Sequence, residues 1–261
     1  MTFQFTPGQS PLLISVPHAG TGLLPELESR LTDQALSLGD TDWHVHRLVE
    51  SATDLGTGVI HAEMSRYVVD LNRPPDDRPL YDQAGTGLVP IETFDGRPLY
   101  RSGQGPDGSE VEQRVRQFWR PYHDRLAAEL ERLRADHGFA VLFDAHSITS
   151  RVPRLFEGRL PDLNLGTYGS RSCAGDLEQR VAGQLASATG FSHVVNGRFQ
   201  GGFITRHYGR PDQGVHALQL EIAQACYMDE SNPESWDEQR AGSLKNLLGA
   251  IFESITRWRP S

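Results

Sequence analysis

Residues 140–147 read AVLFDAHS, and this stretch decides the fold class. Four apolar residues in a row are typical of a short buried strand, which we expect to end at Asp144. His146 then lies just beyond the carboxyl end of that strand. Residues 12–16 (LLISV) form a second apolar run, which ends in a turn that contains His18. Each run therefore predicts a core strand with a histidine at its carboxyl end.

Further strands and helices alternate along the rest of the chain. We expect strands at residues 58–61, 67–71 (YVVDL), 193–195 and 216–222 (HALQLEI). We expect helices at residues 40–55, 109–137, 175–189 and 233–258. This alternation predicts a single α/β domain over residues 1–261, with a mixed, mostly parallel central sheet and helices on both faces. Ligands bind such sheets at the carboxyl ends of the strands.

Individual residues predict where two of these helices begin or end. Ser109, followed three residues later by Glu112, forms a capping box for the helix at 109–137, and Gly138 ends it. Asp40 fits the N-cap of the helix at 40–55. Residues 74–108 are rich in proline, glycine and aspartate, so we expect an irregular loop that is long enough to suggest a function.

The composition excludes several classes of partner. The chain has 34 acidic and 25 basic side chains, a net charge of −9, and no basic tail. Nucleic acid and an anionic membrane surface both require a positive patch, so neither is expected as a partner. No apolar run approaches the roughly 20 residues that span a bilayer, and the N-terminus lacks a signal-peptide pattern. We therefore predict a cytoplasmic protein whose partners are small molecules or proteins.

His18 and His146 together predict a zinc site. The carboxyl ends of parallel strands meet at one edge of a sheet, so the two imidazoles are expected to lie close together. A catalytic zinc ion takes three protein ligands and leaves one position open. Candidates for the third ligand gather at the start of the helix at 40–55, namely Asp40, Asp42, His44 and His46. We favour Asp42, because Asp40 fits the helix cap.

Glu221 and several arginines complete the predicted site. Glu221 lies near the carboxyl end of the HALQLEI strand, and a carboxylate beside zinc can act as general base for an attacking water. Asn72 and Arg73 directly follow the YVVDL strand, and arginine holds a carboxylate through two parallel hydrogen bonds. Arg66 and Arg206 are further candidates for binding an anionic substrate, since glycines before Arg206 allow a ligand to approach closely.

Six motifs, in order along nearly the whole chain, resemble the N-formylglutamate amidohydrolase (N-formylglutamate deformylase) family. They are VPHAG (16–20), DTDWHV (40–45), SRYVVDLNRP (65–74), LFDAHS (142–147), NGRFQGGFITRHYG (196–209) and LQLEIAQACYM (218–228). That family is related to the zinc carboxypeptidases and aspartoacylases, so the resemblance implies their phosphorylase/hydrolase-like α/β fold. It also implies hydrolysis of N-formyl-L-glutamate to formate and L-glutamate, the last step of one bacterial route of histidine degradation.

The resemblance implies roles for individual residues as well. His18 and His146 match the two zinc histidines of the carboxypeptidase relatives, and Glu221 matches their catalytic glutamate. Asn72 and Arg73 match the pair that binds the substrate carboxylate in aspartoacylases. The implied cofactor is one Zn²⁺ ion, or another divalent transition metal in its place.

The second zinc ligand departs from the pattern of the relatives. Their HxxE motif has a glutamate three residues after the first histidine, where this chain has Thr21, so Asp42 is inferred from its position alone. On this hypothesis zinc would polarise the formyl oxygen and activate water, and Glu221 would act as base and then as acid. Asn72, Arg73 and Arg206 would bind the two carboxylates of the substrate.

Three alternative functions stay open at this level. Asp144-Ala145-His146 is similar to the start of the DAHxD motif of arginase-like formimidoylglutamate hydrolases, which use two manganese ions, but Ile148 stands at the second aspartate position. A sister amidohydrolase could act on another N-acyl amino acid or on a cell-wall peptide. A non-catalytic dicarboxylate-binding protein could share the fold. The sequence leaves the native metal and the oligomeric state open.

Overall fold

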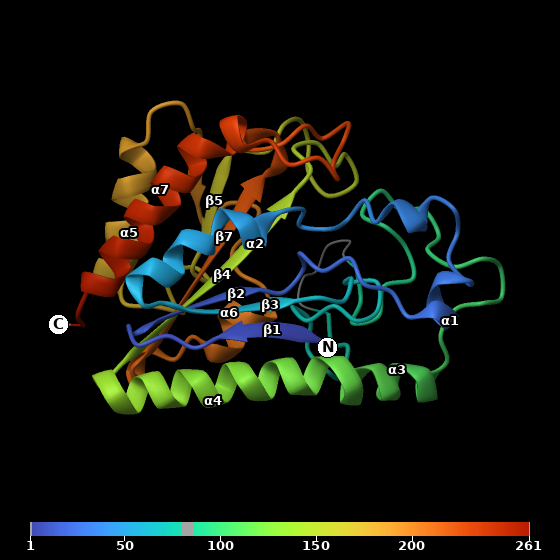
Figure 1. Cartoon of the computed structure of the whole chain (residues 1–261), viewed down its shortest axis with the longest axis horizontal. Helices are drawn as coiled ribbons and strands as arrows, with labels where there is room; N and C mark the ends of the chain where they lie inside the picture. Colours follow the sequence, from blue (N-terminus) through green and yellow to red (C-terminus); the bar gives the residue numbers. More distant parts are fainter. Residues whose placement is uncertain (1, 80–85, 261) are drawn as a thin grey trace.

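The computed structural model describes residues 2–79 and 86–260. Among these residues, seven strands form one sheet in the order β1-β3-β2-β4-β7-β5-β6 (Figure 1). In chain order the strands are β1 (Phe3–Thr6), β2 (Leu12–Val16), β3 (Gly58–Ala62), β4 (Ala140–Ile148), β5 (Leu163–Gly166), β6 (His193–Val195) and β7 (Val215–Ala223). Strands β3, β2, β4 and β7 are parallel, whereas β1 and β5 each run antiparallel to their central neighbour. The mixed, mostly parallel sheet is confirmed.

The helices of the described residues differ widely in length. They are α1 (Pro25–Glu28), α2 (Val45–Leu48), α3 (Gly108–Arg114), α4 (Arg120–His137), α5 (Gly175–Ser187), α6 (Phe203–Tyr208) and α7 (Glu238–Arg257). Short 3₁₀ turns occur at Ala35–Ser37, Glu50–Leu55, Pro211–Gln213 and Gln224–Cys226, and a π-helical turn at Val115–Trp119 joins α3 to α4. None of the helices within the described ranges is long and apolar enough to cross a membrane.

Helices cover both faces of the sheet. Adjacent residues of a strand point to opposite faces, so Phe143 and Asp144 on β4 identify the layers. The ring of Phe143 packs edge-on against Phe252 of α7, with the ring centroids 5.1 Å apart. On the other face, Ser15 donates to Asp144 and hydrogen-bonds to Tyr122 of α4. Figure 1 shows α4 along one side of the sheet and α5 and α7 on the other.

Strands β4 and β7 form the centre of the sheet and carry most of the polar residues of interest. Strand β4 extends to Ile148, so Asp144 and His146 lie within the strand and not beyond its end as the sequence predicted. The polar side chains do not end the strand, because each has a hydrogen-bonding partner inside the protein. The register places His146 opposite Glu221 on β7, and both side chains face the layer that contains α4.

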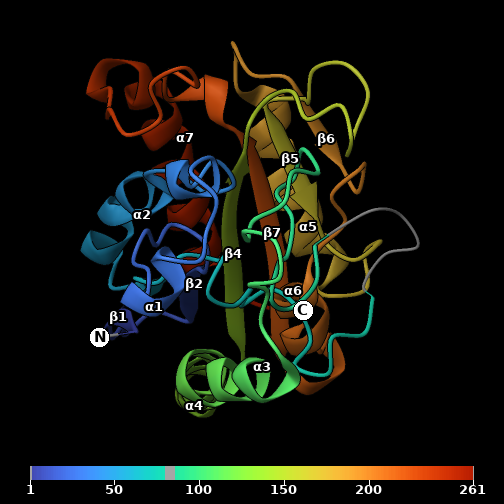
Figure 2. The same ribbon diagram turned by 90° about the vertical axis from the view of Figure 1, so that its right-hand side faces the viewer.

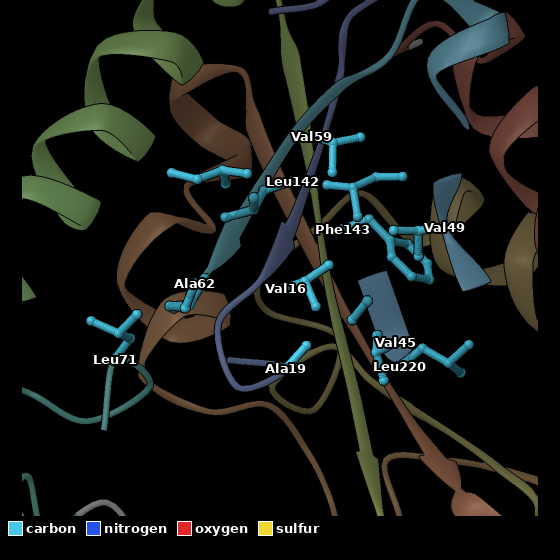
Figure 3. Packing of buried hydrophobic residues seen from close by; sticks show 14 of the residues in the cluster. Val16, Ala19, Val45, Val49, Val59, Ala62, Leu71, Leu142, Phe143 and Leu220 are labelled. Carbon is cyan, nitrogen blue, oxygen red and sulfur yellow. The ribbon is translucent and has the colours of Figure 1, made fainter. Parts of the chain in front are cut away.

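Helix α2 packs on the opposite face and fixes the loop in front of it. Figure 3 shows Val45 and Val49 beside Phe143 and Leu220, and all four side chains are buried. Figure 2 shows α2 and α7 together on one side of β4. This packing anchors the loop that precedes α2 at the carboxyl ends of β2 and β4, where the backbone N–H of Asp42 donates to the carbonyl of His18 over 3.0 Å.

Residues 67–71 do not form the strand that YVVDL predicts. Residues 66–68 form a turn, and the backbone carbonyls of Tyr67, Val68 and Leu71 bond to side chains instead of to a neighbouring strand. The guanidinium of Arg114 donates to the carbonyl of Val68 over 3.1 Å, and His123 hydrogen-bonds to the carbonyl of Leu71 over 2.8 Å. The β-branched residues are buried as in a strand, but Arg114 of α3 and His123 of α4 supply the partners of these carbonyls.

The helix expected at 40–55 is shorter and begins later than predicted. It starts at Val45, after His44 in the left-handed conformation with φ of 61°, and its second half is the 3₁₀ turn Glu50–Leu55. Asp40 is not its N-cap. The carboxylate of Asp40 instead accepts a hydrogen bond from the backbone N–H of Phe94 over 2.9 Å, because a distant loop folds over it.

Other element boundaries were partly predicted. The N-cap of α3 is Asp107 and not Ser109, since the Asp107 carboxylate accepts from the N–H of Glu110. Gly138 ends α4 with φ of 82°, as expected. Helix α7 begins five residues after Pro233, and β1 and β5 were not anticipated. The predicted loop at 74–108 contains no helix or strand before Gly108 in its described part, and its residues 80–85 lie outside the described residues.

Candidate metal centre

His18, Asp42 and His146 come together at the carboxyl ends of β2 and β4. One ligand atom from each residue lies within 4.8 Å of the other two, and all three side chains are buried. His18 follows β2, Asp42 lies in the loop before α2, and His146 is on β4. The parallel pairing of β2 with β4 aligns the two strand ends, which is why residues 128 positions apart in sequence become neighbours.

The Nδ1 atoms of both histidines face Asp42. The Nδ1 of His146 lies 3.0 Å from Asp42 Oδ2, and the Nδ1 of His18 lies 3.8 Å from the same oxygen. The Nδ1 of His18 and the Oδ1 of Asp42 are buried and have no hydrogen-bond partner. The Arg66 Nη1 lies 3.6 Å from Asp42 Oδ1, close enough for an ion pair but not for a hydrogen bond. Two imidazole nitrogens and one carboxylate oxygen are a donor set that suits zinc, and a cation would satisfy the two atoms that lack a hydrogen bond. The residues present therefore fit a metal ion.

A carboxylate holds the far nitrogen of each histidine. Asp70 Oδ1 lies 2.8 Å from the Nε2 of His18, and Asp144 Oδ2 lies 2.8 Å from the Nε2 of His146. For His18, whose Nδ1 has no hydrogen-bond partner, the Asp70 carboxylate favours a proton on Nε2 and leaves the lone pair of a neutral ring on Nδ1. His146 has a carboxylate at each nitrogen, Asp144 at Nε2 and Asp42 at Nδ1. Outer carboxylates of this kind orient metal-binding histidines and raise their basicity.

The electrostatics of the centre favour a positive charge between the acidic groups. Burial lowers the pKa of His146, but Asp144 and Asp42 outweigh that effect and hold the pKa well above its ordinary value. Burial also opposes ionisation of Asp70, yet Arg66 and His18 hold the pKa of this carboxyl well below its usual range. Burial opposes ionisation of Asp42 too, but His146, His18 and Arg66 lower its pKa, so Asp42 and Asp70 are ionised in the folded protein.

The structure separates Asp42 from the other candidates for the third ligand. Asp40 is bonded to the backbone of Phe94, and it lines a different cavity. The Nε2 of His44 hydrogen-bonds to the carbonyl of Pro233, and His46 stacks on His61 away from the centre. Asp42 alone among these four residues joins His18 and His146.

Glu221 lies beside the candidate centre on the neighbouring strand. Its Cα is paired with that of His146, and its side chain lines the same cavity as the three candidate ligands. The strand is central and fully paired, so Glu221 does not belong to the solvated face of an edge strand. Burial raises the pKa of Glu221 to about 8, which keeps a proton near the centre in the absence of further positive charge.

Asn72 lies between the metal centre and helix α6. Its Oδ1 accepts from the backbone N–H of Ile204 over 2.8 Å, which fixes the orientation of the amide. Its Nδ2 is 3.0 Å from the Nε2 of His146 and 3.4 Å from Asp144 Oδ2. Gly202 makes room for this amide, because a Cβ on Gly202 would come within 2.3 Å of Nδ2. Asn72 therefore touches the outer side of His146 as well as the cavity.

Arg66 and Arg73 line the cavity but already have partners. Arg66 donates to Asp70 over 2.7 Å, and its guanidinium lies over the ring of Phe94. Arg73 donates through Nε to the carbonyl of Thr86 over 2.8 Å and through Nη1 to the carbonyl of Asn72 over 3.0 Å. Each arginine is thus held in place, and Arg73 is less occupied by acidic groups than Arg66.

The cavity has a volume of about 640 Å³, including its open mouth. It is lined by most of the residues that the sequence singled out and by others that it did not, namely His18, Asp42, Arg66, Asn72, Arg73, Thr86, Phe94, His146, Ser147, Ile148, Leu155, Arg198, Phe199, Gly202, Gln219 and Glu221. Arg206 is not among them, since its Nε donates to the carbonyl of Gly201 and its guanidinium stacks over Tyr168. Arg198 replaces it as the third arginine of the cavity.

Sequence reasoning missed Asp70, Asp144 and Arg198 as parts of the site. Asp70 and Asp144 stand in the motifs SRYVVDLNRP and LFDAHS, two residues before Asn72 and His146, and that proximity was the signal available. Arg198 stands in the motif NGRFQGGFITRHYG, together with Arg206. Nothing in the spacing distinguishes the two arginines, because only the fold decides which of them enters the cavity.

Comparisons with known proteins agree with this architecture. A sequence profile of the N-formylglutamate amidohydrolase family matches residues 10–228. The N-formylglutamate deformylase of Pseudomonas aeruginosa is 52% identical over 254 residues, covering 97% of this chain and 96% of the relative. The N-formylglutamate deformylase of Pseudomonas putida is 50% identical, covering 97% of this chain and 95% of the relative.

A solved structure shows the same fold. The crystal structure of an N-formylglutamate amidohydrolase from Ralstonia eutropha superposes with a TM-score of 0.85 at 23% identity, covering 98% of this chain and 97% of that one. The profile and the two relatives match the strands and loops that carry His18, Asp42 and His146. The chain therefore belongs to the N-formylglutamate amidohydrolase family, a family of amide-bond hydrolases.

Proposed function

We propose that this protein hydrolyses N-formyl-L-glutamate to formate and L-glutamate with the help of one zinc ion. The observation that carries the proposal is the arrangement of His18, Asp42 and His146 around two buried atoms that lack a hydrogen bond, with Glu221 beside them in one cavity. The two close relatives are N-formylglutamate deformylases, which supports this substrate. We place the reaction in histidine degradation and the protein in the cytoplasm, as the sequence suggested.

His18, Asp42 and His146 would hold the metal, and another divalent transition metal could take the place of zinc. A zinc ion bound there supplies Lewis acidity toward the formyl oxygen and lowers the pKa of water toward about 7. With the metal bound, Asp70 and Asp144 would accept from the Nε2–H of the two imidazoles and leave Nδ1 free to bind the metal. Burial of all three candidate ligands excludes bulk water from the reacting groups.

Glu221 would move the proton. Its carboxylate accepts a proton from the attacking water, the C–N bond breaks, and the same group delivers the proton to the leaving nitrogen. Burial favours the protonated form, so this role requires a positive charge nearby to bring the pKa of Glu221 below its value of about 8. A divalent cation at the neighbouring triad provides such a charge, and product release leaves Glu221 ready for another cycle.

Asn72, Arg73, Arg66 and Arg206 are the residues that we propose for binding the substrate. Arg73 has the clearest geometry, because it lines the cavity and two backbone carbonyls fix its guanidinium. Asn72 can offer one N–H to the cavity while its other atoms hold the Ile204 backbone and touch His146. Arg206 would have to leave its stacked position on Tyr168 to reach the substrate.

The experiment combines metal analysis with product detection. Protein purified without added metal is assayed for bound zinc and manganese. Release of L-glutamate is measured from N-formyl-L-glutamate, N-acetyl-L-glutamate and N-formimidoyl-L-glutamate, and the co-product (formate, acetate or formamide) is identified. One equivalent of zinc and release of L-glutamate with formate from the first substrate alone are the expected results. Turnover of the acetyl compound in preference would favour a sister amidohydrolase, and two manganese ions with the formimidoyl compound would favour the arginase-like alternative.

A matched pair of histidine variants completes the experiment. The His18→Ala variant should lose metal and activity together, whereas the exposed His193→Ala variant should retain both. Binding of L-glutamate without any turnover of the three compounds would identify a dicarboxylate-binding protein and overturn the proposal.

A further inference from the structure

Arg198 is a residue of the cavity to which no role is assigned above. It lies in the loop between β6 and α6, and it lines the cavity that contains the metal triad and Glu221. Its side chain is half-buried. Arg66 and Arg73 lie much earlier in the sequence, so the three cations of the cavity come from two separate parts of the chain.

The guanidinium of Arg198 is oriented but not neutralised. Its Nε donates to the carbonyl of Leu155 over 2.9 Å, which fixes the plane of the group. No carboxylate of the described residues lies within ion-pairing distance of it, in contrast to Arg66, which is paired with Asp70. Both terminal nitrogens of Arg198 therefore remain available as a fork for a planar anion.

Apolar side chains form the wall of the cavity next to Arg198. Ile148, Leu155 and Phe199 line the cavity, and they belong to a second hydrophobic cluster that is separate from the main core. Such a wall is suited to methylene groups and not to charged ones. A ligand that follows this wall toward Arg198 thus needs an aliphatic segment with an anionic end.

We infer that Arg198 binds the carboxylate at the far end of the substrate side chain and makes the enzyme selective for dicarboxylic N-acyl amino acids. This inference rests on the proposed function and deepens it. The glutamyl side chain has two methylene groups and a terminal carboxylate, which match the apolar wall and the cation. Arg73 then binds the carboxylate next to the scissile amide, so each of the two arginines binds one of the two substrate carboxylates.

The test compares N-formyl-L-glutamate with N-formyl-L-glutamine, which has the same length and a neutral end. In the Arg198→Met variant we expect kcat/KM for the glutamate compound to fall roughly 10- to 100-fold, mainly through KM. The value for the glutamine compound should change by less than about threefold. Arg198→Lys, which keeps the charge and loses the fork, should fall between wild type and Arg198→Met.

A control and a second readout keep the outcomes distinct. Arg171→Met removes an exposed arginine that stacks on Tyr168 outside the cavity, and it should match wild type with both substrates. Calorimetric titration with L-glutamate and L-glutamine should show the same loss of preference in Arg198→Met, whether or not the protein is catalytically active.

The results separate this inference from the function on which it rests. If wild type releases no formate from N-formyl-L-glutamate, the proposed function is wrong, and the titration alone decides on Arg198. If wild type is active and both Arg198 variants keep its preference for the glutamate compound, or lose both substrates equally, the inference is wrong and the function stands.

Discussion

His146 and Glu221 occupy paired positions on the two central strands β4 and β7, and their side chains face the same cavity. The pairing sets the imidazole of a candidate metal ligand beside a buried carboxyl group without any loop between them. Rigid strands hold such a constellation more firmly than loops do. The relative position of these two side chains therefore depends on the register of this one strand pair.

Replacing Glu221 with Gln should stop turnover and leave the metal in place. The amide keeps the shape of the side chain but accepts no proton, so we expect kcat to fall by roughly 10²- to 10⁴-fold. Metal content should stay near that of wild type, because Glu221 is not one of the three candidate ligands. The exposed Glu157→Gln serves as control. Substantial turnover by the variant would reject Glu221 as the base.

Replacing Asp144 with Asn should weaken metal binding through His146. The Asp144 carboxylate hydrogen-bonds to both the Nε2 of His146 and the hydroxyl of Ser15. A neutral amide cannot replace it as a charged acceptor, so the imidazole of His146 becomes less basic and less well oriented. We expect metal affinity to fall roughly 10- to 100-fold, measured by competition with a chromogenic chelator. Asp212→Asn, on the surface, should not change the affinity. An unchanged affinity for both variants would show that Asp144 has no such effect.

Replacing Gly202 with Ala should displace Asn72. The new Cβ would lie within 2.3 Å of Asn72 Nδ2, so the amide must move away from His146 and from the backbone of Ile204. We expect kcat/KM to fall at least tenfold, by roughly 1.4 kcal/mol or more of transition-state stabilisation. The matched control is Gly242→Ala on α7, where a Cβ meets nothing within 4 Å. That change should stabilise the fold by about 0.5–1 kcal/mol and leave kcat/KM unaltered.

Acid should destabilise the protein through His123. Burial lowers the pKa of His123 from 6.5 to about 3, and the ring hydrogen-bonds to the carbonyl of Leu71 and to Tyr208 in its neutral form. The unfolded chain binds a proton below pH 6.5 and the folded one does not until about pH 3, so stability falls as the pH drops through this window. The free energy of unfolding should fall by about 1.4 kcal/mol for each pH unit in this window.

To check this, the free energy of unfolding is measured from urea curves at pH values from about 7.5 to about 4.5, for wild type and His123→Asn. The variant has no proton to take up at this position, so the difference in unfolding free energy between wild type and variant should shift against wild type as the pH falls. If the unfolding free energies of wild type and variant change in parallel over the whole pH range, His123 is not neutral in the folded protein.

The amino-acid sequence by itself determined the class of fold and the main chemical groups. Apolar runs such as LLISV and AVLF favour buried strands, and polar residues at the ends of such strands are expected at one edge of a parallel sheet. That argument placed His18, His146 and Glu221 correctly in one region. The helices at 109–137 and 175–189 also followed from periodicity and glycine stops, with boundaries that the structure shifted by a few residues.

Only the tertiary structure decided how these groups are connected. The choice of Asp42 over Asp40 depends on the Phe94 backbone, which lies 54 residues from Asp40 and captures its carboxylate. The entry of Arg198 into the cavity depends on the Leu155 carbonyl, 43 residues away. Hydrogen bonds of this kind join segments that no local pattern relates. A sequence therefore specifies which polar groups need a hydrogen-bond partner, whereas the packing of distant loops determines which partner each of them finds.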